Sequence, residues 1–525
     1  MDQTVPADEI LTSDPSGCPA LVVCRQQGFD PAEALATQFL IDQAPSAPVP
    51  GLRALPMNAW VLHHGRAVEL TEMRDAQGRM FGAFLGIGVD PDGQIISAAS
   101  FAAFDLDAPD FLPRFEHFVA YTAGRYAVVL DCPAGRHVYH DPVAHLTVVY
   151  HPQSRRVASS VMLALNRPLQ PNPRFDSKAI AQATAKGDTE PNFILGHTQD
   201  AEVKFCLPNH RLDLDTFAPA RIWPLPDSFP PAEPEEYDAL VARMVARLKA
   251  ILGALITARP SILPVSGGTD SRKLLACLTD RLDEVAELFA FEHTNYAKLD
   301  ATTGEWVVSH LLGRPFHRYT ASETAPYAPQ SPFDKRRFTR LFWLRTSSVA
   351  KPPNEHLLGM TAATPPGHLH LRGNVMDLMR GVWWGSFAGR NTKVGVTLRE
   401  EISSLFLNPE PGRDLVEKWA EDYHRWKLAL PANAQPVIYD FIFLELFLHV
   451  SSAKYYGYER NFYICPFSDR SLIEMTLRFP IDFRFAGTLN EMFLRAADPA
   501  LADQPYRGGV RDLIKRGDWA PANPG

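Results

Sequence analysis

The stretch from Ser266 to Ser271, Ser-Gly-Gly-Thr-Asp-Ser, holds residue types that bind phosphate. Two adjacent glycines let the backbone adopt positive φ and turn its N–H groups toward one point, where an anion can bind. The hydroxyls of Ser266 and Ser271 add donors, and a helix that begins near Ser271 directs the positive end of its dipole at the same place. We therefore predict a phosphate or pyrophosphate site in this loop.

Asp270 is the residue of this loop that repels phosphate. Its expected role is to hold Mg²⁺ against the phosphate oxygens, because a cation between them removes the repulsion. The kinase-type loop G-x-x-x-x-G-K-[S/T] occurs nowhere in the chain, which disfavours transfer of the terminal phosphate. The alternative is an ordinary glycine turn between a strand and a helix.

The segments around the loop predict a parallel α/β domain over residues 235–525. Residues 235–257 carry apolar side chains at helical spacing, and the compact apolar run 262–265 predicts a buried strand that ends at the loop. A helix over 272–279 and a second strand over 286–291 follow.

The first half of the chain has the pattern of a sheet-rich domain. Short β-branched and aromatic runs at 126–130, 137–139 and 146–150 are separated by turn residues and predict antiparallel hairpins. The proline-rich segment 224–234 blocks both helix and central strand, so we place the linker there. The sequence thus predicts two domains, residues 1–225 and 235–525, in a fold of the α+β and α/β classes.

The loop SGGTDS resembles the SGGxDS loop of the ATP pyrophosphatase superfamily, whose members adenylate a substrate and release pyrophosphate. Two further segments, 300–317 and 465–474, are similar to stretches of the asparagine synthetase group. In the first half, the pattern from Gly124 through Asp141-Pro142 to Ser159 resembles the amidotransferase sandwich of the same enzymes. The resemblance covers roughly residues 110 to 510.

The resemblance implies an N-terminal antiparallel β-sandwich of the N-terminal-nucleophile amidotransferase type and a C-terminal parallel sheet of the adenine-nucleotide α-hydrolase type. It also implies ATP and Mg²⁺ as cofactors. Asp377 falls where the family has its second Mg²⁺ ligand, beside Asp270. The expected ATP-binding residues are Val265, Ser266, Gly267, Gly268, Thr269, Asp270, Ser271, Arg272, Phe291 and Gly373. For Arg272 two roles stay open, contact with phosphate or compensation of helix charge.

Three departures from the family pattern change the expected chemistry. Residue 2 is Asp where glutamine-dependent members have the nucleophilic Cys, so we expect no glutaminase activity. Asn374 occupies the position of a catalytic Glu or Tyr and cannot accept a proton from an amine. Arg507 is the best match to a catalytic Lys that stabilises charge on the adenylate, with Lys515 as the fallback.

The general base is not identified by the sequence. Glu355, His356, Asp440 and Glu445 are candidates that spacing alone does not separate. Arg372 and Arg380 place two guanidiniums around the Asp377 turn, where they could hold a carboxylated or phosphorylated substrate.

We expect an AMP-forming amide ligase that adenylates a small-molecule or peptide carboxylate and couples it to an amine. The alternatives are an ammonia-dependent asparagine synthetase-like enzyme and an ATP-binding protein that has lost catalysis. Beta-lactam synthetase and lasso-peptide cyclases, which join an amine already present on their substrate, share the loss of the nucleophilic Cys.

Composition narrows the class of partner. The net charge of −8 lacks the positive field of nucleic-acid binders, which also disfavours tRNA modification by the same loop. Six scattered cysteines form no zinc or disulfide pattern. The sequence shows no signal peptide and no membrane span, so we expect a cytoplasmic protein, and it leaves a homodimer open.

Overall fold

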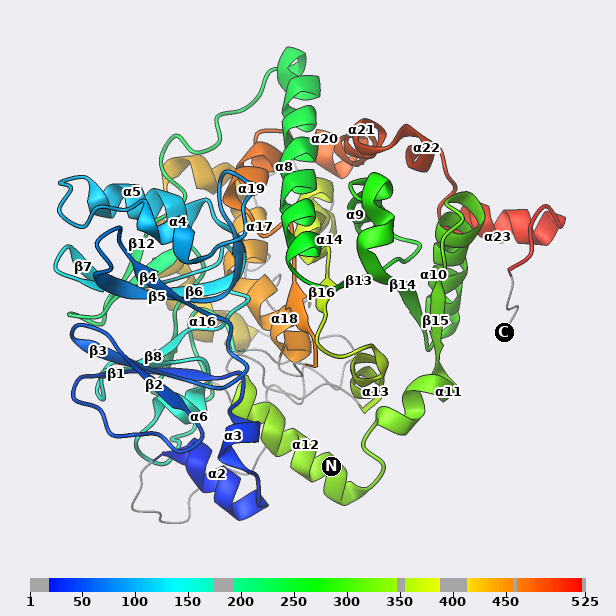
Figure 1. The fold of residues 1–525 in the computed structure, drawn as a ribbon. Coiled ribbons are helices and arrows are strands. Elements are labelled where there is room, and N and C mark those ends of the chain that lie inside the picture. The colour runs from blue at the N-terminus through cyan, green and yellow to red at the C-terminus, as the bar shows by residue number, and fades with distance from the viewer. Residues whose placement is uncertain (1–17, 174–192, 347–354, 388–412, 457–459, 522–525) are drawn as a thin grey trace.

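A computed structural model of the chain describes residues 18–173, 193–346, 355–387, 413–456 and 460–521 (Figure 1). The protein is a mixed α+β protein, with antiparallel sheets in its first half and a parallel sheet with helices in its second. This is the order that the sequence predicts.

The first half contains two antiparallel sheets, which Figure 1 shows stacked on one side of the molecule. The first sheet has the order β10-β8-β9-β1-β3-β2, with β1 (Phe39–Gln43), β2 (Arg53–Pro56), β3 (Trp60–His64), β8 (Val149–His151), β9 (Arg156–Ala158) and β10 (Lys204–Phe205). The second has the order β12-β11-β7-β6-β5-β4, with β4 (Leu70–Arg74), β5 (Met80–Val89), β6 (Ala123–Cys132), β7 (Gly135–His140), β11 (His210–Asp213) and β12 (Pro219–Arg221).

Alternation along β6 explains how these sheets pack. Ala127 and Val129 join Ile41 and Trp60 of the other sheet in one apolar core, whereas Val128 points to the opposite face, since successive side chains of a strand alternate. That face is covered by phenylalanines of α4 (Ala98–Ala102) and α5 (Phe111–Ala120). The remaining helices of this half are α2 (Pro19–Gln27), α3 (Pro31–Ala34) and α6 (Val161–Ala164).

The three strands predicted in this half have different outcomes. The predicted strands at 126–130 and 137–139 are confirmed as β6 and β7, which pair as a hairpin. Of 146–150 only the end is a strand, β8, and it pairs with β9 and β10 in the other sheet rather than with β7. The buried Asp141 accepts hydrogen bonds from the backbone N–H groups of His145 and Leu146, which holds residues 141–146 in a turn.

The second half is built on a parallel sheet with the order β15-β14-β13-β16-β17. Its strands are β13 (Ser261–Pro264), β14 (Val285–Glu292), β15 (His317–Thr320), β16 (Leu369–Leu371) and β17 (Phe462–Ile464). The chain starts at the centre, runs outward through β14 and β15, and returns to the other side at β16. The strand order therefore reverses between β13 and β16, which is where open parallel sheets bind ligands.

Helices surround this sheet (Figure 1). They are η1 (Pro234–Glu236), α8 (Tyr237–Ala258), α9 (Thr269–Ala276), η2 (Thr279–Glu284), α10 (Asn295–Glu305), η3 (Trp306–Leu311), α11 (Ala321–Thr324), η4 (Ala325–Tyr327), α12 (Pro332–Arg345), α13 (Glu355–Ala363), η5 (Asn374–Arg380), α14 (Val382–Phe387), α16 (Arg413–Leu428), η6 (Ala432–Val437), α17 (Ile438–Phe441), η7 (Ile442–Phe447), α18 (Leu448–Tyr456), α19 (Arg470–Leu477), α20 (Ile481–Phe485), α21 (Thr488–Ala497), α22 (Pro499–Ala502) and α23 (Arg507–Arg516). The helix expected at 272–279 is α9, which begins three residues earlier, inside the predicted loop.

The two halves share buried contacts. One apolar core contains Val89 and Ala123 of the antiparallel sheet together with Leu248 of α8. Buried Arg470 donates to the side chain of Asn209 and to the carbonyl of Ala120, both in the first half. These contacts fix the antiparallel half against the helices of the parallel half.

Among the described residues, one stretch, Ala432–Ser452, is long and apolar enough to cross a membrane by length and composition. It lies inside the protein, with 72% of its most apolar window buried. It is therefore explained as the core helical segment of a globular protein.

Candidate functional site

The glycine loop, residues 266–271, leaves the carboxyl end of the central strand β13 and runs into α9. The Val265 side chain is buried in the core, and its N–H donates to the carbonyl of Phe289 on β14 at 2.7 Å, which anchors the start of the loop. Gly268 is the N-cap of α9, and no side chain of the described residues caps this helix. The first-turn N–H groups of α9 therefore belong to the loop itself and lie beside the carboxylate of Asp270.

The glycines serve a different purpose from the one the sequence suggested. Gly268 has φ −89° and ψ 174°, and neither Gly267 nor Gly268 is among the described residues with positive φ, so the expectation of a left-handed turn is wrong. Gly267 is needed for space. A Cβ at this position would lie 2.3 Å from Cγ of Arg507 and 2.8 Å from Oδ1 of Asp300.

Side-chain oxygens accept hydrogen bonds from the first three amides of the loop. Ser266 N–H donates to Oγ of Ser271 at 3.0 Å, and Gly268 N–H donates to Oγ of Ser266 at 3.3 Å. Gly267 N–H donates to Oδ1 of Asp300, on α10, at 2.9 Å. Each of these three N–H groups thus has its own side-chain acceptor, and for Gly267 that acceptor is a carboxylate. A phosphate could bind these amides only if it displaced the Ser271, Asp300 and Ser266 oxygens.

Arg507, at the start of α23, lies directly over the loop. Its Nε donates to the carboxylate of Asp300, the same oxygen that accepts from Gly267, and its guanidinium carbon lies 4.3 Å from the centre of the Tyr296 ring. Lys515 is exposed, eight residues further along the same helix and so about 12 Å away along its axis. The structure brings Arg507, and not Lys515, to the glycine loop.

Asp270 and Asp377 form a carboxylate pair bridged by the guanidinium of Arg380. Nη2 of Arg380 contacts Oδ2 of Asp270 at 2.9 Å and also contacts Oδ1 of Asp377. Nζ of Lys273 lies 3.2 Å from the other oxygen of Asp270. Gly373, at the end of β16, makes the approach of η5 close, since a Cβ there would lie 2.8 Å from Cβ of Asp270.

Burial and neighbouring charges shift the pKa values of two groups at this site, Asp377 and Lys273. Burial and the like charge of Asp270 raise the pKa of Asp377 to about 6. Burial also lowers the pKa of the Lys273 ammonium, which is fully buried. The Asp270 and Asp377 side chains are still 23% and 31% exposed, so the site is partly open to solvent and only Lys273 is fully buried.

The donor set fits Mg²⁺. This ion is commonly held by one or two carboxylates, with phosphate and water as the other ligands. Two carboxylate oxygens already surround one cation here, next to the loop expected to bind phosphate. Within the described residues there is no group of three or more His, Cys, Asp or Glu side chains that could form a metal cage, so substrate phosphates would have to complete the coordination.

Arg272 does not face the loop. It is 1% exposed, donates to the carbonyls of Gln504 and Pro505, and stacks on the ring of Tyr506 at 4.0 Å. The two roles expected for this side chain were contact with phosphate and compensation of helix charge, and neither describes these contacts. Instead it fixes the segment that immediately precedes Arg507.

Asn374 lies beside the carboxylate pair in sequence but is engaged elsewhere. Its Nδ2 donates to Oγ of Ser452 at 3.0 Å, and its Oδ1 accepts from Nε of Arg372 at 3.2 Å. Phe291, at the end of β14, packs on Phe289 and Tyr319, with ring centres 5.3 and 5.6 Å apart. It lies at the same edge of the sheet as the glycine loop.

Two candidate bases are structural ion-pair partners. Asp440 pairs with Arg484 at 2.7 Å, both fully or almost fully buried. Glu445 is completely buried and accepts from Arg221, Asn209 and Trp426. The side chains of Glu355 and His356 lie outside the part of the chain that the structure describes.

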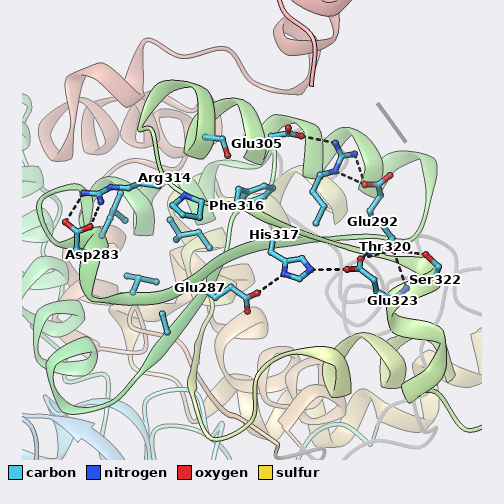
Figure 2. A pocket seen from close by; sticks show the side chains of 17 residues that line it. Asp283, Glu287, Glu292, Glu305, Arg314, Phe316, His317, Thr320, Ser322 and Glu323 are labelled. Atoms are coloured by element: carbon cyan, nitrogen blue, oxygen red, sulfur yellow. Dashed lines mark hydrogen bonds and ion pairs between the residues drawn. The ribbon is translucent and has the colours of Figure 1, made fainter. Parts of the chain in front are cut away.

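A cavity of about 1150 Å³ lies elsewhere, along β14 and β15 (Figure 2). It contains none of the predicted residues, and its labelled charges pair with one another. Arg314 binds Asp283, Arg318 binds Glu292 and Glu305, and His317 lies between Glu287 and Glu323. The glycine loop remains the candidate site, because it brings Asp270, Asp377 and Arg507 together where the strand order reverses.

Comparison of this sequence with known families and curated proteins finds no match. No protein-family model matches the chain, and no curated protein matches it. The resemblance to the asparagine synthetase group therefore depends on the sequence motifs alone.

Sequence reasoning missed two partners at the site, Lys273 and Asp300. Lys273 had a usable signal, since it follows Asp270 by three residues on one helix and so shares its face. The same spacing relates Asp377 and Arg380. Asp300 opens the segment 300–317 that the resemblance singled out, but its contact with Gly267 joins two separate elements and no spacing in the sequence indicates it.

Proposed function

We propose that this protein is an ATP-dependent, AMP-forming amide ligase of the asparagine synthetase type, without glutaminase activity. The observation that carries the proposal is the meeting of Asp270 and Asp377 around one cation position beside the glycine loop. They come from elements that follow the neighbouring strands β13 and β16, so the fold brings both proposed metal ligands next to the glycine loop.

The finer fold assignment belongs to the same proposal. The stacked antiparallel sheets are consistent with an amidotransferase-type sandwich, and the order β15-β14-β13-β16-β17 with an adenine-nucleotide α-hydrolase-type domain. All six cysteines are buried, and burial raises the pKa of each thiol. A buried protonated thiol is a poor nucleophile, which supports the loss of glutamine hydrolysis.

In the proposed reaction, a carboxylate oxygen bonds to the α-phosphorus of ATP and pyrophosphate leaves. An amine nitrogen then bonds to the acyl carbon, AMP leaves and one proton is released. Mg²⁺, held by Asp270 and Asp377, would neutralise charge on the phosphates. The loop amides and the N-terminus of α9 bind the pyrophosphate oxygens, and Arg507 places its guanidinium over them.

Exchange of labelled pyrophosphate into ATP tests the first step. With Mg²⁺ and a pool of candidate carboxylates, we expect exchange with the wild-type protein and a loss of about a hundredfold or more in Asp270→Asn and in Asp377→Asn, because each removes a ligand of the metal. Asp283→Asn is the matched control, since Asp283 lies in the separate cavity. Full exchange in Asp270→Asn would contradict the proposal.

A second candidate is a nucleotide-binding protein without catalysis. It is favoured by Asn374, which cannot act as a base, and by the hydrogen bonds that already engage its side chain. Calorimetric binding of Mg·ATP with no exchange for any carboxylate would support it. If exchange occurs, the product mass with ammonium or organic amines separates an asparagine synthetase-like enzyme from a ligase for another amine.

A further inference from the structure

Four charged side chains at the carboxylate pair neutralise one another. Asp270 and Asp377 carry two negative charges, and Arg380 and Lys273 carry two positive ones, all linked by ion pairs. A divalent ion added to this set, with no other partner, brings an excess of positive charge into a partly buried site. A polyphosphate removes that excess.

The two cations are held differently. Lys273 is fully buried and donates to Oδ1 of Asn490 at 2.6 Å as well as pairing with Asp270, so it is a fixed part of the core. Arg380 has 37% of its side chain exposed. Its Nε is buried without an acceptor among the described residues. Arg380 is therefore the cation that can turn away from the pair, and it has an unused donor for a new acceptor.

Arg380 also occupies the place proposed for the metal. One nitrogen, Nη2, contacts an oxygen of each carboxylate, as a bridging cation would. A divalent ion that binds both oxygens displaces this nitrogen. Without phosphate, the displaced guanidinium loses both acceptors. With phosphate beside the glycine loop, it gains oxygens that suit its planar set of donors.

We propose that Arg380 couples the binding of metal and nucleotide, by holding the position of the divalent ion in the free protein and moving to the phosphates when both ligands arrive. This inference rests on the proposed function and adds a positioning residue to it. Because coupling between two ligands is reciprocal, each ligand then binds weakly alone and tightly with the other.

Titration of the full chain with Mn²⁺, followed by the paramagnetic resonance signal of the free ion, measures this coupling. The nucleotide probe is the α,β-methylene analogue of ATP, which cannot release pyrophosphate. For the wild type we expect the analogue to tighten Mn²⁺ binding at least tenfold, after correction for Mn²⁺ held by free analogue. In Arg380→Gln we expect Mn²⁺ alone to bind about tenfold more tightly than to the wild type, and the coupling to fall toward one.

Two variants make the test specific. Arg314→Gln is the matched control, because Arg314 has the same exposed fraction, 37%, and also pairs with a carboxylate; it should behave like the wild type. Arg380→Lys keeps the charge and should retain weak binding of Mn²⁺ alone. Melting curves check that each variant is folded.

The outcomes separate the two proposals. Unchanged binding of Mn²⁺ alone in Arg380→Gln, with coupled binding intact in the wild type, overturns the role of Arg380 and leaves the proposed function standing. Failure of the wild type to bind the analogue with Mn²⁺ overturns the proposed function and, with it, the coupling.

Discussion

Two adjacent glycines of the candidate site face different surroundings. A methyl group on Gly267 would overlap Arg507 and Asp300, whereas on Gly268 its closest contact would be Oγ of Ser266 at 3.4 Å, an ordinary van der Waals distance. Only Gly267 is therefore required by packing, and it is required because Arg507 and Asp300 approach the backbone there.

This difference predicts unequal effects of the same substitution. Gly267→Ala should displace Arg507 and reduce pyrophosphate exchange about a hundredfold, the scale expected when a catalytic group shifts by about 1 Å. Gly268→Ala is the matched control and should lose less than about tenfold. Exchange rates and melting temperatures of both variants test this, and an equal loss in both would show that backbone freedom, not space, explains the glycine pair.

At the scale of single residues, the sequence indicated which residues belong to the site better than which contacts their side chains make. The resemblance selected Arg507 from its motif, and the structure places Arg507 over the loop. It also selected Arg272, whose side chain turns away to Gln504 and Pro505. Adjacency in sequence says little about side-chain direction at the start of a helix, because successive residues point about 100° apart.

Among the elements, those with strong periodicity were predicted and the shortest were not. Strands β6 and β7 and helix α8 carry clear patterns, and β13 and β14 are compact apolar runs. Strands β16 and β17 have three residues each, too few for a pattern to be recognised. The strand order that brings Asp377 to Asp270 depends on β16, so the sequence could not show that meeting without the family resemblance.

Helix α23 is the element that carries Arg507, and it has few buried contacts. Of its residues only Val510 is buried. Beyond its end, Trp519 packs edge-on against Trp306 with ring centres 5.1 Å apart, and before its start Arg272 holds residues 504 and 505. The helix is thus fastened mainly at its two ends.

We therefore expect α23 to open locally more readily than α9. Backbone hydrogen exchange should be at least tenfold faster in 507–516 than in 269–276, since helices with few buried contacts unfold at low local cost. Trp519→Ala should accelerate exchange in α23 further while changing the melting temperature little. Mass spectrometry of exchanged peptides measures this. Trp384→Ala, which removes a buried core ring, is a contrasting variant that should lower the melting temperature instead.

At the scale of the whole molecule, the sequence did not predict the contacts between the two halves. The proline-rich segment indicated where the texture of the chain changes, but not that Arg470 and Asn209 bind across the halves. Such contacts join residues far apart in the chain, and no local pattern encodes them. Histidines are buried in the same region, and their burial makes the stability of the protein depend on pH.

His140 of β7 and His449 of α18, one from each half, predict a loss of stability at acidic pH. Burial lowers the pKa of His140 from 6.5 to about 4 and that of His449 to about 3. Between these values and 6.5 the unfolded chain binds more protons than the native protein, so stability is full above pH 6.5 and falls as the pH drops toward 4. For His140 alone the loss between pH 7.5 and 5 is about 2 kcal/mol.

Melting temperatures of variants at pH 7.5 and 5 isolate this contribution. His140→Gln removes the titrating ring, so its melting temperature should fall less between the two pH values than that of the wild type. The exposed His117 provides the control, and His117→Gln should keep the full pH dependence. Other buried groups titrate in this range, but the variants share them, so only the difference between variants reports on His140. An equal fall in all three proteins would mean that His140 is not held uncharged at the boundary between the halves.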